Sequence, residues 1–420
     1  MSKPSGDSDW ALVLAPEPPY PVAGGGPIRT ASLCRFLADR GRVHLITFGV
    51  GPASRREIPA ELAHQVDWVD LPAHSKSLPV RMARNAARLL RGTLPLTDRF
   101  TESGVRGQVA RAVAGRRYRV AVIEHFWCAP YRPLLVQHAD QVVLDMHNVE
   151  SALHERCATT DHWPARWGHH RFARLARRDE AGLLPAFDLV LAASECDRNR
   201  LAELAPTARF AVYPNTLPAR FPAPATEDHC VAFSGNLEYH PNVTAVRFFA
   251  CRVWPALRDR DPNLRWRLIG RNPDAVARWI GGDPRIEATG PVDDALAELA
   301  RARVVVAPLL SGSGTRIKIL EAWAAGRAVV STQLGAEGLP ARHRENLLLA
   351  DSPAEIVEAV LVLLGDEALR RRLGEAGRRL VEEQFCWPAA WRGLEPWLGV
   401  ELEKPLECDS PLTRTRSGSN

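Results

Sequence analysis

The chain has 420 residues, of which 46% are hydrophobic and 25% are charged, and it carries a formal net charge of +5. This length favours two domains over one, and the composition is ordinary for a soluble globular enzyme. The small net charge argues against a dedicated nucleic-acid-binding protein, and no stretch approaches the ~20 apolar residues that a membrane-spanning helix needs.

Short apolar runs alternate with amphipathic segments along the whole chain. In the first half they predict buried strands at residues 10–16, 42–48, 118–124, 141–147, 187–194 and 208–215. In the second half they predict strands at residues 230–236, 264–270, 285–290, 303–309, 327–333 and 346–352. Helical patterns lie between most of these runs, for example at 28–40 and 166–184. This alternation predicts βαβ units, and therefore parallel sheets covered by helices on both faces.

Proline is frequent in residues 214–230, where the apolar periodicity stops. We therefore expect an α/β protein with two doubly wound, Rossmann-like domains, at residues 1–215 and 216–400, in preference to a single eight-stranded barrel. The aromatic segment 385–399 is helix-like, and whether it packs back across the first domain stays open. Residues 401–420 have no core-forming pattern, so we expect a disordered tail.

Three consecutive glycines, Gly24, Gly25 and Gly26, follow the first predicted strand. Glycines at the carboxyl end of a parallel strand let the backbone approach a bound phosphate or an acceptor. The spacing is not G-x-G-x-x-G, which argues against a dinucleotide site. A plain strand-to-helix turn is the alternative interpretation.

His125 and His147 end two successive predicted strands. If these strands are neighbours, both side chains lie at the edge where parallel sheets bind ligands. Catalytic and purely structural histidines both fit this pattern. Glu124, Glu150 and Glu180 are second choices as general bases, because no fixed spacing relates them.

Two basic stretches could form outer helices. Residues 81–119 contain ten arginines and only two acidic residues. A helix in this stretch would turn three apolar side chains towards anionic lipid, namely Met82, Leu89 and Leu90. Residues 162–178 add a second basic stretch with the aromatic side chains Trp163, Trp167 and Phe172. Solvated outer helices are the alternative to membrane contact.

A small-residue loop, residues 311–314, follows the predicted strand 303–309 and runs into a helix. Thr315 could cap that helix, and Arg316 and Lys318 bring two cations to its N-terminus, where an anion is favoured. Glu321 shares the helix face of Lys318 and could accept hydrogen bonds from sugar hydroxyls. Phosphate beside a diol describes a nucleotide, whereas an ordinary exposed pair of Lys318 and Glu321 is the alternative.

The segments "GTRIKILEAWAAGRAVVSTQLGAEGL" and "FSGNLEYHPNVTAVRFF" carry a family resemblance, supported by "LRWRLIGRNP", "IEATGPVDD" and "GGGPIRTASLCRFLADRGRVHLITF". They resemble the family 4 (group 1) glycosyltransferases, of the exopolysaccharide-cluster type with a "GTRLKILEA"-like motif. The resemblance extends to about Trp397 and is strongest over residues 233–339. It implies the GT-B fold, in which an N-terminal acceptor-side domain faces a C-terminal nucleotide-sugar-binding domain across a cleft.

The resemblance also implies roles for single residues. Glu321 matches the second of two family glutamates, which contacts the donor ribose, whereas Ser313 occupies the first glutamate position. The family's usual arginine and lysine are missing from "SGNLEYHPN", so Arg316 and Lys318 are expected to hold the diphosphate. The implied catalytic residues are His125, His147 and Glu321. Of the two histidines, His125 matches the family's N-domain histidine better. The implied donor-binding residues are Gly25, Gly26, Gly235, Asn236, Ser313, Gly314, Thr315, Arg316, Lys318, Glu321, Glu337 and Gly338.

The expected activity is transfer of a sugar from a nucleoside-diphosphate donor to a glycan, lipid-linked or small-molecule acceptor, with retention of anomeric configuration, in polysaccharide or glycoconjugate biosynthesis. We expect no cofactor and no metal, and interpret the "DRD" triplet at 259–261 as a solvated helix end. Eight scattered cysteines without C-x-x-C spacing favour the cytoplasm. The two basic stretches add the inner face of the plasma membrane as an expected location. A nucleotide-sugar epimerase of the same fold and a non-catalytic nucleotide-sugar-binding protein are the alternatives.

Overall fold

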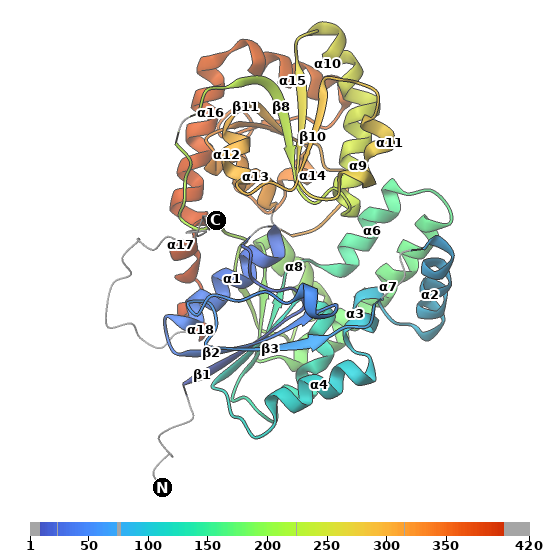
Figure 1. The fold of residues 1–420 in the computed structure, drawn as a ribbon, viewed down its shortest axis with the longest axis vertical. Coiled ribbons are helices and arrows are strands. Elements are labelled where there is room, and N and C mark those ends of the chain that lie inside the picture. Colours follow the sequence, from blue (N-terminus) through green and yellow to red (C-terminus); the bar gives the residue numbers. More distant parts are fainter. Residues whose placement is uncertain (1–8, 23, 74–76, 224, 315, 399–420) are drawn as a thin grey trace, which may run out of the picture.

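Two α/β domains lie one above the other in the computed structural model (Figure 1). The structure describes residues 9–22, 24–73, 77–223, 225–314 and 316–398. The N-terminal domain is coloured blue to green in the figure, and most of the C-terminal domain is yellow to orange. Each domain is built on one parallel sheet, so the predicted α/β fold with two Rossmann-like domains is confirmed.

The N-terminal sheet has seven strands in the order β3-β2-β1-β4-β5-β6-β7, all parallel. These strands are β1 (Trp10–Ala15), β2 (Arg42–Gly49), β3 (Gln65–Asp70), β4 (Val120–Glu124), β5 (Val142–Met146), β6 (Leu189–Ala192) and β7 (Phe210–Val212). The order switches direction between β1 and β4, the point where doubly wound sheets bind ligands. The sequence analysis missed β3, because this edge strand buries little beyond Val69 and lacks a continuous apolar run.

The C-terminal sheet has six parallel strands in the order β10-β9-β8-β11-β12-β13. These strands are β8 (Asp228–Ser234), β9 (Arg265–Ile269), β10 (Ile286–Gly290), β11 (Ala302–Ala307), β12 (Ala328–Ser331) and β13 (Leu348–Leu349). All six were predicted. β7 ends at Val212 and β8 begins at Asp228, so the connection between the sheets runs through the proline-rich stretch.

Helices cover both sheets. In the N-terminal domain they are α1 (Gly25–Ala38), α2 (Leu78–Arg91), α3 (Pro95–Phe100), α4 (Ser103–Val113), α5 (Arg132–Leu135), α6 (Glu150–Thr160), α7 (Ala165–Leu183) and α8 (Glu195–Leu204). In the C-terminal domain they are α9 (His240–Phe248), α10 (Trp254–Arg260), α11 (Ala277–Ile280), α12 (Ala295–Ala300), α13 (Ile317–Ala324), α14 (Gln333–Ala336), α15 (Pro353–Gly365) and α16 (Glu367–Leu380). Alternate residues of one strand enter separate cores: Leu12 and Leu14 of β1 face one, and Val13 faces the other. The apolar runs are continuous because both faces of each sheet are buried.

After α16 the chain crosses back to the N-terminal domain through α17 (Trp387–Trp391) and α18 (Glu395–Leu398), which lie beside α1 in Figure 1. Trp391 packs in the same core as Phe36 of α1, and its indole nitrogen donates a hydrogen bond to Ser32 Oγ (3.0 Å). The packing of segment 385–399, which the sequence left open, is therefore decided by the first domain. The predicted tail, 401–420, lies outside the described residues. Among the described helices, none is both long and apolar enough to span a bilayer.

Candidate active site

Loops at the carboxyl ends of the two sheets touch each other across the domain boundary. Gly25 lies against the start of α13, since a Cβ on Gly25 would be 3.6 Å from Ile317 Cγ1. From the other side, Ser313 Oγ donates to the carbonyl oxygen of Val149, which precedes α6 (3.2 Å). The residues predicted for one site are therefore brought together from both domains.

His125 follows β4 directly, and β4 pairs with β5, so the predicted neighbouring of the two histidine-bearing strands is confirmed. His125 has a φ of 64°, which is uncommon for a residue other than glycine. Its ring is stacked between Trp127 (centroid distance 4.2 Å) and His147 (3.5 Å), and Nε2 lies 3.7 Å from the Cβ position of Gly26. Burial lowers the pKa of His125 well below its usual value, so the ring is neutral at pH 7.

His147 is next to His125, but its ring is held from within the N-terminal domain. Its Nε2 lies 2.5 Å from Oε2 of Glu124 and 3.6 Å from Oδ2 of Asp145. Burial raises the pKa of Glu124 and lowers the pKa of His147, which favours one shared proton over an ion pair. Of the two histidines, His125 is thus the one whose ring edge faces the glycine loop, and His147 supports it.

A buried arginine in α1 neutralises this acidic group, and the sequence analysis did not single it out. Arg29 has no exposed surface, and its guanidinium binds both carboxylate oxygens of Asp145, with Nε donating to Oδ2 at 2.8 Å. A third nitrogen donates to the carbonyl oxygen of Tyr213 (2.6 Å). The available signal was a charged residue inside the otherwise apolar and small-residue helix "GGPIRTASLCRFLA", because an unpaired cation there would be costly.

Arg316 is the residue directly before α13, and it is buried. One guanidinium nitrogen donates to the carbonyl oxygen of Ser313, whereas Nε and Nη2 have no hydrogen-bond partner within the described part of the chain. Burial lowers the pKa of Arg316. A buried cation with N–H groups to spare fits an anionic ligand at this position.

Lys318 reaches from α13 to the first turn of α9, directly after the loop that follows β8. Its Nζ donates to Asn242 Oδ1 (2.6 Å) and lies 4.0 Å from the centre of the Phe233 ring, and burial lowers its pKa to about 7. Gly235 has a φ of 142°, and a Cβ there would be 2.7 Å from Asn242 Nδ2, so the loop requires glycine. Asn236 contributes its carbonyl oxygen to the same amide (2.8 Å). Lys318 therefore lies against the "SGNLEYHPN" loop, which has no cation of its own.

Glu321 lies one turn further along α13 and is half-buried. Ser234 Oγ donates to its Oε2 (3.3 Å), and burial raises the pKa of Glu321 to about 7. Lys318 and Glu321 are both half-buried, and each has its own hydrogen-bond partner among the described residues, Asn242 and Ser234. The carboxylate therefore lies at the carboxyl end of β8.

The loop before α13 is shaped by contact with the other domain. Gly314 has a φ of 77°, and a Cβ there would be 2.3 Å from the carbonyl oxygen of His147. Only glycine fits so close an approach. Ser313 is buried beside it, in a contact that leaves little room for the larger glutamate of the family pattern. The predicted helix cap, Thr315, lies outside the described residues.

Glu337 joins the domains in this structure. Both of its carboxylate oxygens accept hydrogen bonds from Arg156 of α6 (2.7 and 2.9 Å) and from Arg200 of α8 (3.2 and 2.7 Å). Burial opposes ionisation, but these hydrogen bonds lower the pKa of Glu337 to about 2. Gly338 packs against Ser194 of the N-terminal domain. The predicted donor contacts of Glu337 and Gly338 stay predictions, and the sequence analysis missed the ion pair.

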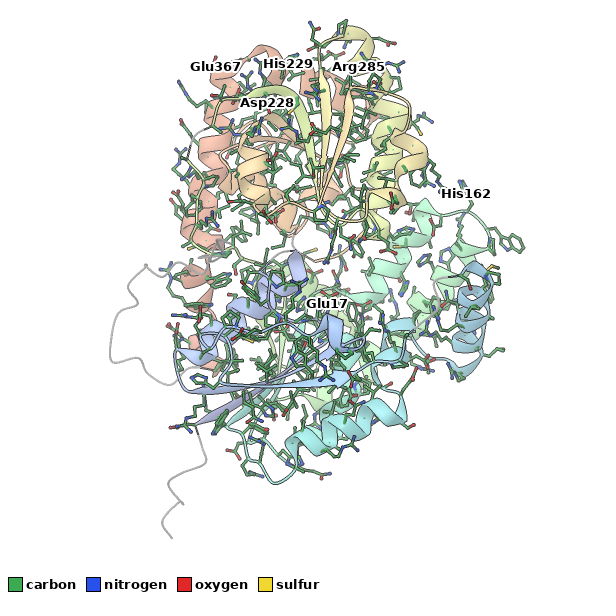
Figure 2. The ribbon with its side chains drawn as sticks, in the orientation of Figure 1. Glu17, His162, Asp228, His229, Arg285 and Glu367 are labelled. Carbon is green, nitrogen blue, oxygen red and sulfur yellow. The ribbon has the colours of Figure 1, made fainter. Side chains whose placement is uncertain are left out.

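The remaining acidic candidates are placed elsewhere. Glu150 accepts a hydrogen bond from Trp127 Nε1 (3.1 Å), and burial raises its pKa to about 8, whereas Glu180 accepts from the Ser151 backbone. The "DRD" triplet ends α10, where Asp261 Oδ2 lies 2.8 Å from His229 Nε2. Figure 2 shows His229 at the far end of the C-terminal domain, whereas Glu17 lies at the domain boundary. The triplet is therefore remote from the domain boundary.

Two Rossmann-like domains whose carboxyl-end loops meet define the GT-B class of fold. Sucrose-phosphate synthase from Thermosynechococcus elongatus has a similar structure, with a TM-score of 0.71 and 18% identity over 93% of this chain and 98% of that one. HepE from Anabaena, in complex with UDP-glucose, gives a TM-score of 0.66 and 14% identity over 93% and 99% of the two chains. At this level of identity, the likeness shows the fold.

Residues 228–366 match the sequence model of the family described as "Glycosyl transferases group 1". The predicted resemblance to the group 1 glycosyltransferases is therefore confirmed over these residues. An exopolysaccharide phosphotransferase of Streptomyces coelicolor is 29% identical over 203 residues, 46% of this chain and 21% of that protein. A phosphatidyl-myo-inositol mannosyltransferase of Mycobacterium leprae is 31% identical over 139 residues, 32% of this chain and 37% of that protein. The matches thus span 21% to 37% of the length of these curated relatives.

Proposed function

We propose that the chain transfers a sugar from a nucleoside-diphosphate donor to an acceptor hydroxyl in polysaccharide or glycoconjugate biosynthesis. Transfer retains the anomeric configuration and uses no divalent cation at the diphosphate. The observation that carries the proposal is the pair of cations at the start of α13, where buried Arg316 has two N–H groups without a partner among the described residues. HepE binds UDP-glucose on the same fold, and TarM of Staphylococcus aureus binds UDP.

In this mechanism the diphosphate leaves with an increased negative charge. Arg316 and Lys318 stabilise that charge from fixed positions, which is the role that a metal ion plays in other enzymes. Glu321 accepts hydrogen bonds from the ribose hydroxyls. Across the cleft, His125 contacts the transferred sugar, and Gly25 and Gly26 let the backbone approach the donor. Holding donor and acceptor in one geometry supplies a large part of the rate.

The proposal is tested by incubating the chain with nucleotide sugars chosen by a thermal-shift screen. Release of nucleoside diphosphate that depends on a glycan or lipid-linked acceptor is the expected result, and the anomeric configuration of the product is read by NMR. Adding Mg²⁺ or Mn²⁺ to the chelator-treated chain should leave turnover unchanged. Conversion of the donor without an acceptor would indicate an epimerase. Tight donor binding without any conversion would indicate a binding protein.

Replacing Arg316 or Lys318 with alanine should weaken binding of the nucleoside diphosphate alone. Charge-assisted contacts of this kind contribute about 1.5–3 kcal/mol, so each substitution should raise Kd by about 10–150-fold in calorimetry. Arg342→Ala is the matched control, because Arg342 is exposed and pairs with the exposed Glu345 one turn away. Diphosphate affinity that stays unchanged in both variants would remove the two cations from the donor site.

We also propose that α2 lies on the inner face of the plasma membrane. One arginine of α2, Arg88, turns towards the protein, where it is buried and ion-paired with Asp98 (2.9 Å), whereas Arg91, which also binds Asp98, stays exposed. Its outer face is apolar, with Leu90 89% and Met82 57% exposed. This polarity is the reverse of a solvated helix, and it fits insertion of the apolar face between lipids.

The structure corrects two expectations about these basic stretches, because Leu89 packs against the core and Phe172 is buried in it. Two further aromatic side chains are exposed at the start of the neighbouring helix α7, Trp163 and Trp167.

The double substitution Met82→Glu and Leu90→Glu should abolish most of the binding of the chain to anionic vesicles. Two apolar side chains of this size contribute about 1.5–3 kcal/mol each when buried, so vesicle affinity should fall by at least ~10-fold. The measurement is co-sedimentation with vesicles containing phosphatidylglycerol. Val362→Glu, on the exposed face of α15 in the other domain, is the control. Equal sedimentation of the double variant and the control would contradict the proposal.

A further inference from the structure

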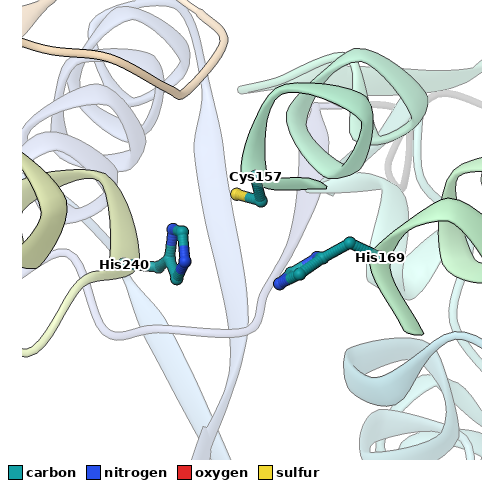
Figure 3. A group of neighbouring side chains, drawn as sticks. All are labelled: Cys157, His169 and His240. Carbon is teal, nitrogen blue, oxygen red and sulfur yellow. The ribbon is translucent and has the colours of Figure 1, made fainter. Parts of the chain in front are cut away.

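Three side chains with metal-binding atoms converge where the two domains meet beside the proposed donor site. Cys157 comes from α6, His169 from α7 and His240 from the first turn of α9, and Figure 3 shows them pointing towards one another. Their ligand atoms all lie within 4.8 Å of one another. Cys157 is buried, whereas the histidine side chains keep 22% and 33% of their surface exposed, so an ion can reach the cluster from solvent.

Two further residues hold the imidazoles from outside. Asp161 Oδ1 lies 2.9 Å from His240 Nε2, and its Oδ2 lies 3.3 Å from His169 Nε2. His154 Nδ1 lies 2.9 Å from His169 Nδ1, so both nitrogens of His169 have a partner in this structure and one of them must release it when an ion binds. A carboxylate or a second donor on the far nitrogen of an imidazole is the usual support of a metal-binding histidine, because it fixes the ring and the position of its proton.

Hydrogen bonds leave one buried ring nitrogen of this cluster without a partner. Nδ1 of His240 is buried and has no hydrogen-bond partner within the described part of the chain, although Nε2 of the same ring is bound to Asp161. With the proton on Nε2, the unshared electron pair of Nδ1 is free. His240 thus keeps one ring nitrogen without a partner in a residue that lies beside the thiol and the other imidazole.

We propose that Cys157, His169 and His240 bind a Zn²⁺ ion, with Asp161 and His154 as supports and water as the fourth ligand. One thiolate and two imidazoles form a donor set that suits Zn²⁺ and is poor for Mg²⁺ or Ca²⁺. Bonds of about 2.0–2.3 Å to a tetrahedral ion place ligand atoms about 3.3–3.8 Å apart, so these side chains need only a small approach. On binding, the Cys157 S–H bond breaks, its proton goes to solvent, and the thiolate sulfur bonds to the ion.

The ion would join the two domains. Cys157 and His169 belong to the N-terminal domain, whereas His240 begins α9 of the C-terminal domain, two residues before Asn242, the partner of Lys318. The same two surfaces already meet through Arg247, which donates to the carbonyl oxygen of Thr160 (3.0 Å). Zinc at this place would hold the start of α9 against α6 without touching the donor diphosphate. The proposal is therefore independent of the glycosyl-transfer proposal and leaves its metal-free diphosphate contact unchanged.

The test uses the full chain after chelator treatment and desalting. Once Zn²⁺ is added, we expect the chain to retain one equivalent through gel filtration. With Co²⁺ in place of Zn²⁺, it should show a thiolate charge-transfer band and the intense visible bands of tetrahedral cobalt. Cys157→Ser should remove the charge-transfer band, and His240→Ala should lower Zn²⁺ affinity by more than ~100-fold. His154→Ala removes only a support and should lower it by ~10–100-fold. Zinc should raise the melting temperature of the wild type and not of His240→Ala.

Cys251→Ser and His170→Ala are the matched controls, because both side chains are exposed on the neighbouring helical segments and both variants should bind like the wild type. Each variant is first melted without metal, so that a folding defect is seen separately from a binding defect. Failure of the folded wild type to retain zinc would overturn the proposal. So would a cobalt spectrum and zinc affinity that persist in Cys157→Ser and His240→Ala.

Discussion

Replacing Arg29 with methionine should lower the free energy of unfolding by about 3–5 kcal/mol, the range found when one partner of a buried ion pair is removed. Arg29 and Asp145 are both fully buried, and Glu124 lies in the same acidic group. Without the guanidinium, the Asp145 carboxylate has lost both of its short charge-assisted contacts. The measurement is urea-induced unfolding followed by circular dichroism.

The loss of unfolding free energy in Arg29→Met should be larger at high pH than at low pH. Burial already raises the pKa of Glu124 to about 7, with Arg29 acting against it, so removal of Arg29 raises the pKa further. A carboxyl group whose pKa is raised on folding stabilises the folded state below its unfolded pKa, and this stabilisation is lost as the pH rises through the folded value. The defect of Arg29→Met should therefore be smaller near pH 5 than near pH 8.

Arg35→Ala is the matched control on the same helix. Arg35 forms a half-exposed i,i+4 pair with Asp39 (3.0 Å), so its removal should cost about 0–1 kcal/mol. Equal stabilities of the Arg29 and Arg35 variants would show that the buried pair is not needed to hold the site. A defect that grows towards pH 5 would show that our assignment of the protonation states is wrong.

Removing the imidazole of His125 should lower turnover by ~10²-fold or more, the scale of losing one preorganised group that acts as the glycosidic bond breaks. Affinity for the nucleoside diphosphate should barely change, because Arg316 and Lys318 lie in the other domain. His125→Asn is the informative variant. Asparagine tolerates the positive φ of this position better than alanine, so the backbone is preserved while the ring is removed.

Melting temperature and turnover are measured on the same preparation of His125→Asn and His125→Ala. A purely structural histidine would lower the melting temperature and leave the turnover of the folded fraction nearly intact. That outcome would transfer the catalytic role to His147. His147 is held by Glu124 at 2.5 Å, so His147→Ala should in our proposal act mainly through the orientation of the His125 ring.

Local pattern was sufficient for the fold. The apolar runs of β1 and β11 identify buried parallel strands because both faces of each sheet are covered, a property of the strand itself. β3 was not predicted because it is an edge strand with partly exposed residues, so its sequence lacks a continuous apolar run. It is recognised as a strand only by its pairing with β2.

The sequence by itself predicted a nucleotide site, because Arg316 directly precedes α13, Lys318 and Glu321 lie on it, and their spacing places the three together. It could not determine contacts between residues that are far apart in the chain. The pairing of Arg29 with Asp145, of Glu337 with Arg156 and Arg200, and the convergence of Cys157, His169 and His240 were decided by tertiary structure alone. Helix and strand periodicity set which face a side chain takes, whereas only the packing of whole elements sets which distant side chain it meets.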